Sequence, residues 1–294
     1  TIWSFTTDTV GDVPAGGTWT DGVETVTATI TDRTTPARTF TLTTTADLRD
    51  GVAPERVVSE IAGTPSLRSG HDVFDGMFAL AMDEVRENSV SAIQDGAFDN
   101  GNPLPCECFE TGALWHYAWT RDTAYAADLA LAWADPVRTR NSLQFKLSPL
   151  KSAAGGGTVE IVQDTGTGGS WPVSTDRVVW AIGAKRTLAF LPEPERSAFE
   201  AETLEALRNT LYTDRDVVFD ASTGLYRGEQ SFLDWREQTY PAWAAADLIH
   251  IAQSQSLSTN VGHLALLRLA TELTTDPAEV ATWSDWSEDL AASI

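Results

Sequence analysis

The spacing of apolar residues changes near residue 70, and this change divides the chain into a β-rich part and a helical part. Val26, Ala28 and Ile30 alternate with threonines, and the residues around Phe40 do the same. A period of two, rich in β-branched residues, is typical of half-buried strands. We therefore predict a β-rich region over residues 1–65.

After residue 70 the apolar residues recur at intervals of three and four, which predicts a helix that runs from Phe74 to Ala92. A long turn-rich loop is expected over residues 95–112. Asp135 followed by Pro136 is typical of a helix start, and that helix should end before Pro149. Helices are further predicted over 121–134, 175–190, 199–211, 241–254, 259–273 and 277–292, with a β-hairpin over 217–227.

Helices joined alternately by short links and long loops are typical of an (α/α)-barrel, in which the long loops build the site. We therefore predict a mainly α fold of the (α/α)6-barrel type, preceded by a β-sandwich piece. The domains would be 1–65, β-rich, and 66–294, the catalytic barrel. A helical bundle with loops that only decorate it is the alternative.

Composition limits the class of ligand. The chain has 294 residues and a formal net charge of −22. So acidic a protein is a poor partner for nucleic acid or an anionic membrane, which require basic patches, and no apolar run is long enough to span a bilayer. A neutral ligand fits better, and no cofactor is expected. The chain begins at Thr1 inside a patterned region, so we expect it to be processed or truncated, and its compartment is left open.

The two cysteines, Cys106 and Cys108, are separated by a single residue. A disulfide between them would close a small ring that is difficult to form, and two thiols are too few for a structural zinc site. We predict two partly buried thiols.

Four segments combine aromatic and charged residues near loops or helix starts. A sugar ring needs an aromatic face for its C–H side and charged hydrogen-bond partners for its hydroxyls. The first segment holds Trp119, Arg121 and Asp122, although a helix cap with a salt bridge would give the same pattern. The others are 98–102, 163–177 with Trp171 and Asp176, and 226–238 with Asp234, Trp235, Arg236 and Glu237. The 98–102 loop lacks the ligand spacing of a calcium loop, so no metal site is predicted.

Asp234 is the best candidate for a catalytic acid. Glycoside cleavage requires a carboxylic acid that stays protonated near neutral pH, and apolar neighbours raise the pKa of a carboxyl group. Asp234 stands between Leu233 and Trp235. The alternative role is an ion pair with a nearby arginine that fixes the loop.

Trp119-Thr120-Arg121-Asp122 resembles the substrate-binding motif of glucoamylases, and similar helix starts occur in glycogen-debranching and processing oligosaccharide glucosidases. Residues 224–228 and 232–235 look like the segment that presents the general acid in debranching-type enzymes. The resemblance covers roughly residues 70–250 and implies a six-hairpin glycosidase fold. It implies that Asp234 is the acid, that Arg121 and Asp122 hold the hydroxyls of the terminal sugar, and that Trp119 stacks on it. The string after Asp234 departs from the debranching pattern, which leaves Glu237 open as the acid.

Enzymes of these families mostly invert the configuration at the anomeric carbon. A second carboxylate activates the attacking water, and the two carboxyl groups lie about 6.5–9.5 Å apart. The helices predicted are fewer than the twelve of an (α/α)6 barrel, so we expect the base to lie beyond Ile294, with Asp164, Asp176 or Glu237 as the alternatives. The prediction is an exo-acting, inverting glycosidase for an α-glucoside or related oligosaccharide.

The rival functions are a non-catalytic carbohydrate-binding or structural module, a phosphorylase of the same fold, and an (α/α) polysaccharide lyase. The phosphorylase is disfavoured because no basic phosphate pocket is evident. The lyase would need a Tyr/His or metal centre, and none of the four histidines is predicted to pair with a tyrosine: His71, His116, His250 and His263.

Overall fold

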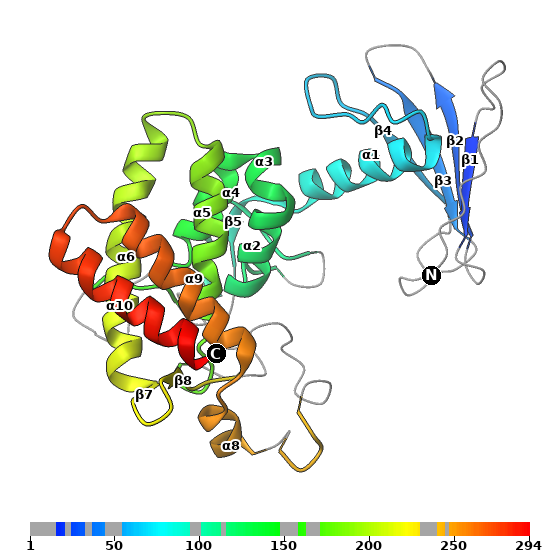
Figure 1. Ribbon diagram of the computed structural model, residues 1–294. Helices are drawn as coiled ribbons and strands as arrows, with labels where there is room; N and C mark the ends of the chain where they lie inside the picture. Colours follow the sequence, from blue (N-terminus) through cyan, green and yellow to red (C-terminus); the bar gives the residue numbers. More distant parts are fainter. Residues whose placement is uncertain are drawn as a thin grey trace. The chain divides into compact units, whose positions relative to one another are not determined.

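The computed structural model is mainly helical and divides into two compact units, Thr1–Asn88 and Ser89–Ile294 (Figure 1). The residues that the structure describes are 16–20, 25–32, 37–44, 55–94, 101–112, 116–147, 158–162, 171–229, 240–244 and 247–294, without the side chains of 16–20, 25–32, 43, 44, 55 and 176. Among the helices in these ranges, none has the length and hydropathy of a membrane span.

The second unit begins with a hairpin and continues as helices. Its helices are α2 (Thr120–Ala126), α3 (Ala132–Ala134), α4 (Pro136–Gln144), α5 (Trp180–Phe190), α6 (Glu195–Val217), α8 (Leu248–Gln253), α9 (Leu257–Leu273) and α10 (Pro277–Ser293). A π-helical turn, η2 (Ala127–Leu131), joins α2 to α3, and a 3-10 turn, η4 (Asp176–Val179), precedes α5. The mainly α class is confirmed.

Local signals set several of these helix ends. Asp135 accepts a hydrogen bond from the backbone of Arg138 at the start of α4, as its position before Pro136 predicted. Asp276 caps α10 in the same way. Thr175, the first residue of the helix predicted over 175–190, makes no capping hydrogen bond with its side chain: its hydroxyl donates to the carbonyl of Arg227 instead.

The core of the second unit lies between α5, α6, α9 and α10. Trp180 of α5 and Trp283 of α10 are fully buried there, with leucines of α6 and α9 between them. Gly183 lets α5 approach α2 closely, because a Cβ at this position would lie 2.9 Å from the Cα of Ala124. Close-packed helices of this kind are rigid supports for the loops that connect them.

The hairpin at the start of this unit corrects two predictions. The helix expected to reach Ala92 ends at Glu87, and β5 (Ser89–Ile93) pairs antiparallel with β6 (Leu104–Phe109) inside the expected loop. Ser89 and Ala92 continue the helical spacing of the residues before them, so the period alone did not reveal the strand. The short hairpin 217–227 was predicted correctly, as β7 (Phe219–Asp220) and β8 (Leu225–Tyr226).

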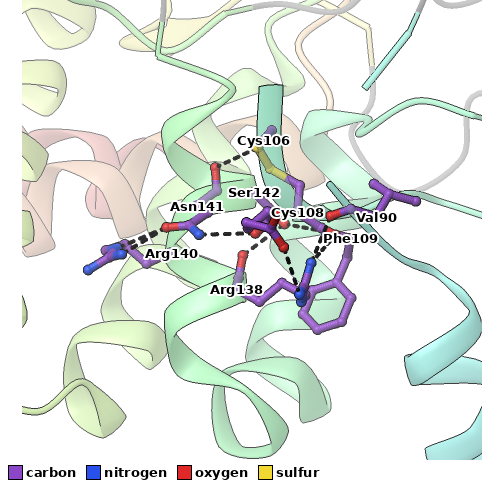
Figure 2. The surroundings of a disulfide bond; sticks show 9 residues. Val90, Cys106, Cys108, Phe109, Arg138, Arg140, Asn141 and Ser142 are labelled. Atoms are coloured by element: carbon purple, nitrogen blue, oxygen red, sulfur yellow. Dashed lines mark hydrogen bonds and ion pairs between the residues drawn. A yellow bond between two sulfur atoms is a disulfide. The ribbon is translucent and has the colours of Figure 1, made fainter. Parts of the chain in front are cut away.

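Cys106 and Cys108 form a disulfide on β6, so the prediction of two free thiols is wrong (Figure 2). Residues two apart on a strand point to the same side, and the two Cα atoms lie 5.2 Å apart, within the ordinary disulfide range. α4 holds the same strand: Asn141 donates to the carbonyl of Glu107, and Arg138 to that of Cys108.

The first unit contains one four-stranded antiparallel sheet in the order of the chain, β1 (Gly16–Thr20), β2 (Thr25–Asp32), β3 (Thr39–Thr44) and β4 (Glu55–Ser59). Phe40, Leu42 and Val58 of this sheet pack against Ala79 of α1 (Asp72–Glu87). The described residues of this unit therefore form a sheet covered by a helix, and the expected β-sandwich is not established. Because α1 packs on the sheet, the boundary between the units falls after Asn88 and not near residue 65.

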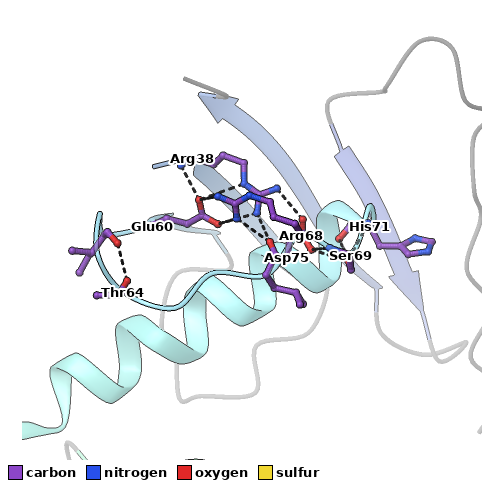
Figure 3. A network of polar contacts seen from close by, with 9 residues as sticks. Arg38, Glu60, Thr64, Arg68, Ser69, His71 and Asp75 are labelled. Atoms are coloured by element: carbon purple, nitrogen blue, oxygen red, sulfur yellow. Dashed lines mark hydrogen bonds and ion pairs between the residues drawn. The ribbon is translucent and has the colours of Figure 1, made fainter. Parts of the chain in front are cut away.

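A polar network ties α1 to the sheet (Figure 3). Arg38 bonds Glu60 and Asp75, both at 2.8 Å, and donates to the carbonyl of Leu67. Burial would raise the pKa of Glu60, but hydrogen bonds from Arg38 and Arg68 outweigh it and lower that pKa to about 2. The network fixes the segment that leads from β4 into α1.

Candidate functional site

Trp119-Thr120-Arg121-Asp122 lies where α2 begins. Trp119 is the N-cap residue, with an extended backbone and no capping hydrogen bond from its side chain. Trp119 and Arg121 are half-buried and Asp122 is exposed. The hydroxyl of the buried Thr120 donates to the carbonyl of Val162 at 3.0 Å. The motif is thus at the protein surface and is anchored to residues 158–162.

The support under Trp119 is an aromatic cluster with a buried lysine. The ring of Tyr117 meets Trp119 edge to face at 4.8 Å and Phe145 at 5.9 Å. Lys146 is fully buried, with its Nζ 3.1 Å from the Tyr117 hydroxyl and 4.4 Å from that ring. The sequence prediction missed Lys146, although a lone lysine between Phe145 and Leu147 was a visible signal.

Trp171 is held on two sides. Its indole Nε1 donates to Asp214 Oδ1 at 3.0 Å, and the guanidinium of Arg177 lies 5.3 Å from its ring. Arg177 also pairs with Asp214 at 2.5 Å. The half-buried indole therefore has a fixed orientation, as a stacking platform requires. Asp176 lies in η4, and its side chain is outside the described residues.

Arg177 and Asp214 belong to a buried charged cluster that also contains Glu160 and His263. All four side chains are essentially inaccessible to solvent. Arg177 lies 3.4 Å from Glu160, and His263 Nε2 lies 3.3 Å from Asp214 Oδ2 without hydrogen-bond geometry. Thr213 donates to the other Glu160 oxygen at 2.6 Å. None of these contacts was predicted from the sequence, because the partners lie on different elements.

The charges in this cluster compensate one another. Burial alone would raise the pKa of Asp214, but Arg177 and His263 outweigh it and lower that pKa to about 2. Asp214 is therefore ionised at neutral pH. A buried carboxylate with charged partners is costly to disrupt, so the cluster fixes Trp171 and η4 relative to α6 and α9.

His263 stacks on Tyr226, with ring centroids 3.8 Å apart and planes 10° from parallel. The prediction that no histidine pairs with a tyrosine is therefore wrong. Both rings are buried, and burial raises the pKa of Tyr226 to about 12 despite the opposing effect of Arg215. A pair closed to solvent is suited to packing and not to proton transfer with a polysaccharide.

The fourth segment is described as far as Glu229. Gly228 has a φ of 142°, and a Cβ there would lie 2.2 Å from the hydroxyl of Thr175. Glu229 is buried and forms a β-bridge with Ser174, and its carbonyl accepts from Thr259. The predicted residues Asp234, Trp235, Arg236 and Glu237 lie outside the described residues, as does Asp164.

Two contacts bring three of the four predicted segments together. α2, which begins with the first segment, packs against η4 at the end of the third, and Ser174 joins the third to Glu229 of the fourth. In the 98–102 loop only Gly101 and Asn102 are described, and the Gly101 carbonyl accepts from Gln94. No group of three potential metal ligands occurs in the described part of the chain.

No protein-family model matches this chain, and no match was found among curated proteins or among solved structures.

Proposed function

We propose that this protein is a glycoside hydrolase, exo-acting and inverting, that cleaves an α-glucoside or a related oligosaccharide. The proposal includes an (α/α)-barrel type of catalytic domain. The observation that carries it is the proximity of three predicted sugar-binding segments: α2, which begins with the first, packs against η4 at the end of the third, and Ser174 of the third forms a β-bridge with Glu229 of the fourth. These segments are distant in sequence, and a binding site must be assembled from such distant loops on a rigid support.

The half-buried aromatic residues favour a sugar ligand. Trp119 rests on Tyr117, and Trp171 is fixed by Asp214 and Arg177. A rigid indole offers an apolar face to the C–H side of a sugar with little loss of side-chain entropy. Arg121 and Asp122, beside Trp119, would bond the hydroxyls of the terminal ring.

In the proposed reaction Asp234 donates its proton to the glycosidic oxygen as the bond to the anomeric carbon breaks. A second carboxylate takes a proton from water, whose oxygen attacks the anomeric carbon from the opposite face. Within this sequence the candidate bases are Asp164, Asp176 and Glu237. Trp235 and Arg236 would contact the sugar beside the acid.

The test is turnover of a panel of aryl glycosides by the protein and by Asp234→Asn. Loss of a general acid should lower kcat by about 10²–10⁴ while leaving sugar affinity nearly unchanged. Asp216→Asn, an exposed carboxylate of α6, is the matched control and should keep full activity. Arg121→Ala should raise KM for the same substrate.

Other results would redirect the proposal. Full activity in Asp234→Asn with loss in Glu237→Gln would move the acid to Glu237. Phosphate-dependent release of a sugar phosphate would make the protein a phosphorylase. Sugar binding without turnover of any substrate would make it a carbohydrate-binding module.

A further inference from the structure

Trp243 is an exposed tryptophan in an ordered turn. Its side chain is 72% exposed, although the turn is held by backbone hydrogen bonds from Ala244 to Pro241 and from Asp247 to Ala244. The neighbouring Ala244 is buried and anchors the turn. The indole of Trp243 is therefore available to stack on a ligand.

The imidazole of His250 stands next to this indole. The two ring centroids are 5.5 Å apart and the planes are nearly perpendicular, at 87°. His250 Nδ1 lies 2.6 Å from Asp247 Oδ2, and Asp247 also accepts from the backbone of His250 and Ile249. The hydrogen bond from His250 lowers the pKa of Asp247, which therefore stays ionised at neutral pH.

This arrangement fixes the imidazole through one of its two nitrogens. With Nδ1 bonded to Asp247, Nε2 is the ring atom that can exchange hydrogen bonds with a ligand, and the side chain of His250 is 59% exposed. The perpendicular rings place a hydrogen-bonding group next to the exposed indole, where it can reach a ligand that contacts Trp243. An apolar platform with a lateral hydrogen-bonding group suits a sugar ring.

The same turn follows the segment that would carry the acid. Gly228 and Ser254 exchange two hydrogen bonds of 2.8 Å, from the Gly228 N–H to the Ser254 carbonyl and from the Ser254 hydroxyl to the Gly228 carbonyl. The hydroxyl of Tyr240 lies 3.4 Å from the same Ser254 hydroxyl. Gly228 and Tyr240 therefore both lie beside Ser254, the residue that follows α8.

We propose that Trp243, with His250 and Asp247 beside it, is a second carbohydrate-binding surface, which takes a neutral sugar unit of a longer glycan. This inference rests on the proposed function, since it assumes a carbohydrate ligand. A neutral glycan fits better than a polyanion because the protein carries a net charge of −22. Leu248 and Ile249 are also exposed nearby, so a second copy of the chain is the occupant that the experiment must exclude.

The experiment begins with an array of neutral gluco-, manno- and galacto-oligosaccharides probed with the unaltered protein. The dissociation constant of the longest glycan that binds is then measured by titration calorimetry. Trp243→Ala should weaken binding at least tenfold, His250→Ala less, and Trp243→Phe should recover most of it. Trp133→Ala, an exposed tryptophan of α3, is the matched control and should change the affinity less than twofold.

Each outcome decides between the two proposals. Unchanged affinity in Trp243→Ala, together with weakened binding in Arg121→Ala, overturns this inference and leaves the proposed function standing. Weakened binding in Trp243→Ala, with no turnover of any substrate, supports the inference and overturns the hydrolase. Absence of any bound glycan overturns both. A dimer that dissociates in Trp243→Ala, seen by light scattering, overturns the inference in favour of self-association.

Discussion

Replacing Asp214 by asparagine tests whether the buried charged cluster stabilises the second unit. Asparagine has almost the same shape and keeps an oxygen that can accept from Trp171, but it removes the charge facing Arg177 at 2.5 Å and His263 at 3.3 Å. Breaking one partner of a buried ion pair costs about 3–5 kcal/mol, because the remaining charge is left buried. We expect a loss of that size in the free energy of unfolding at pH 7.

The pH dependence of stability gives a second estimate of the free energy that the Asp214 charge contributes to folding. The pKa of Asp214 is lowered from 3.8 to about 2 in the folded protein. At about 1.4 kcal/mol per unit, this corresponds to about 2–3 kcal/mol of stability. Because the folded pKa is the lower one, this contribution is present above pH 4 and is lost as the pH falls toward 2. The difference in stability between the protein and Asp214→Asn should shrink over that window.

The assay is urea denaturation followed by tryptophan fluorescence at several pH values. Nine of the eleven tryptophans follow residue 88, so the signal reports mainly on the second unit. Asp216→Asn, which changes an exposed carboxylate on the same helix, is the control. This control variant should lose far less free energy of unfolding than Asp214→Asn. A variant of Asp214 within about 1 kcal/mol of the parent at pH 7 would refute the role assigned to the cluster.

Two further changes probe the backbone and the first unit. Gly228→Ala should destabilise the protein by about 2 kcal/mol or more, because the positive φ of Gly228 and its contact with Thr175 both oppose a side chain. Thermal unfolding measures this loss of stability. Adding Thr175→Ala to the same variant should recover part of it. Arg38→Met should cost on the order of 3 kcal/mol, because it leaves Glu60 and Asp75 without their shared partner. Backbone hydrogen exchange in β3, β4 and α1 would locate that effect, and unaltered protection there would contradict it.

Features that depend on neighbours in sequence were predicted well. The cap at Asp135 and the hairpin over 217–227 each depend on the conformational preferences of a few adjacent residues. The first helix was predicted to continue through Ala92. That prediction failed because only the pairing of β5 with β6 makes these residues a strand. The Cys106–Cys108 disulfide was missed because sequence separation does not give the distance between their Cα atoms.

The sequence by itself determined the helical class and the β-rich start, and it marked out segments of aromatic and charged residues, because periodicity, caps and composition are properties of the local chain. Only the tertiary structure decided which of those residues meet. Arg177, Asp214 and His263 stand on three separate elements, and Lys146 becomes buried under Tyr117 only when α4 packs. A buried charge is tolerated only beside a compensating partner, and the fold, not the local sequence, brings that partner into contact.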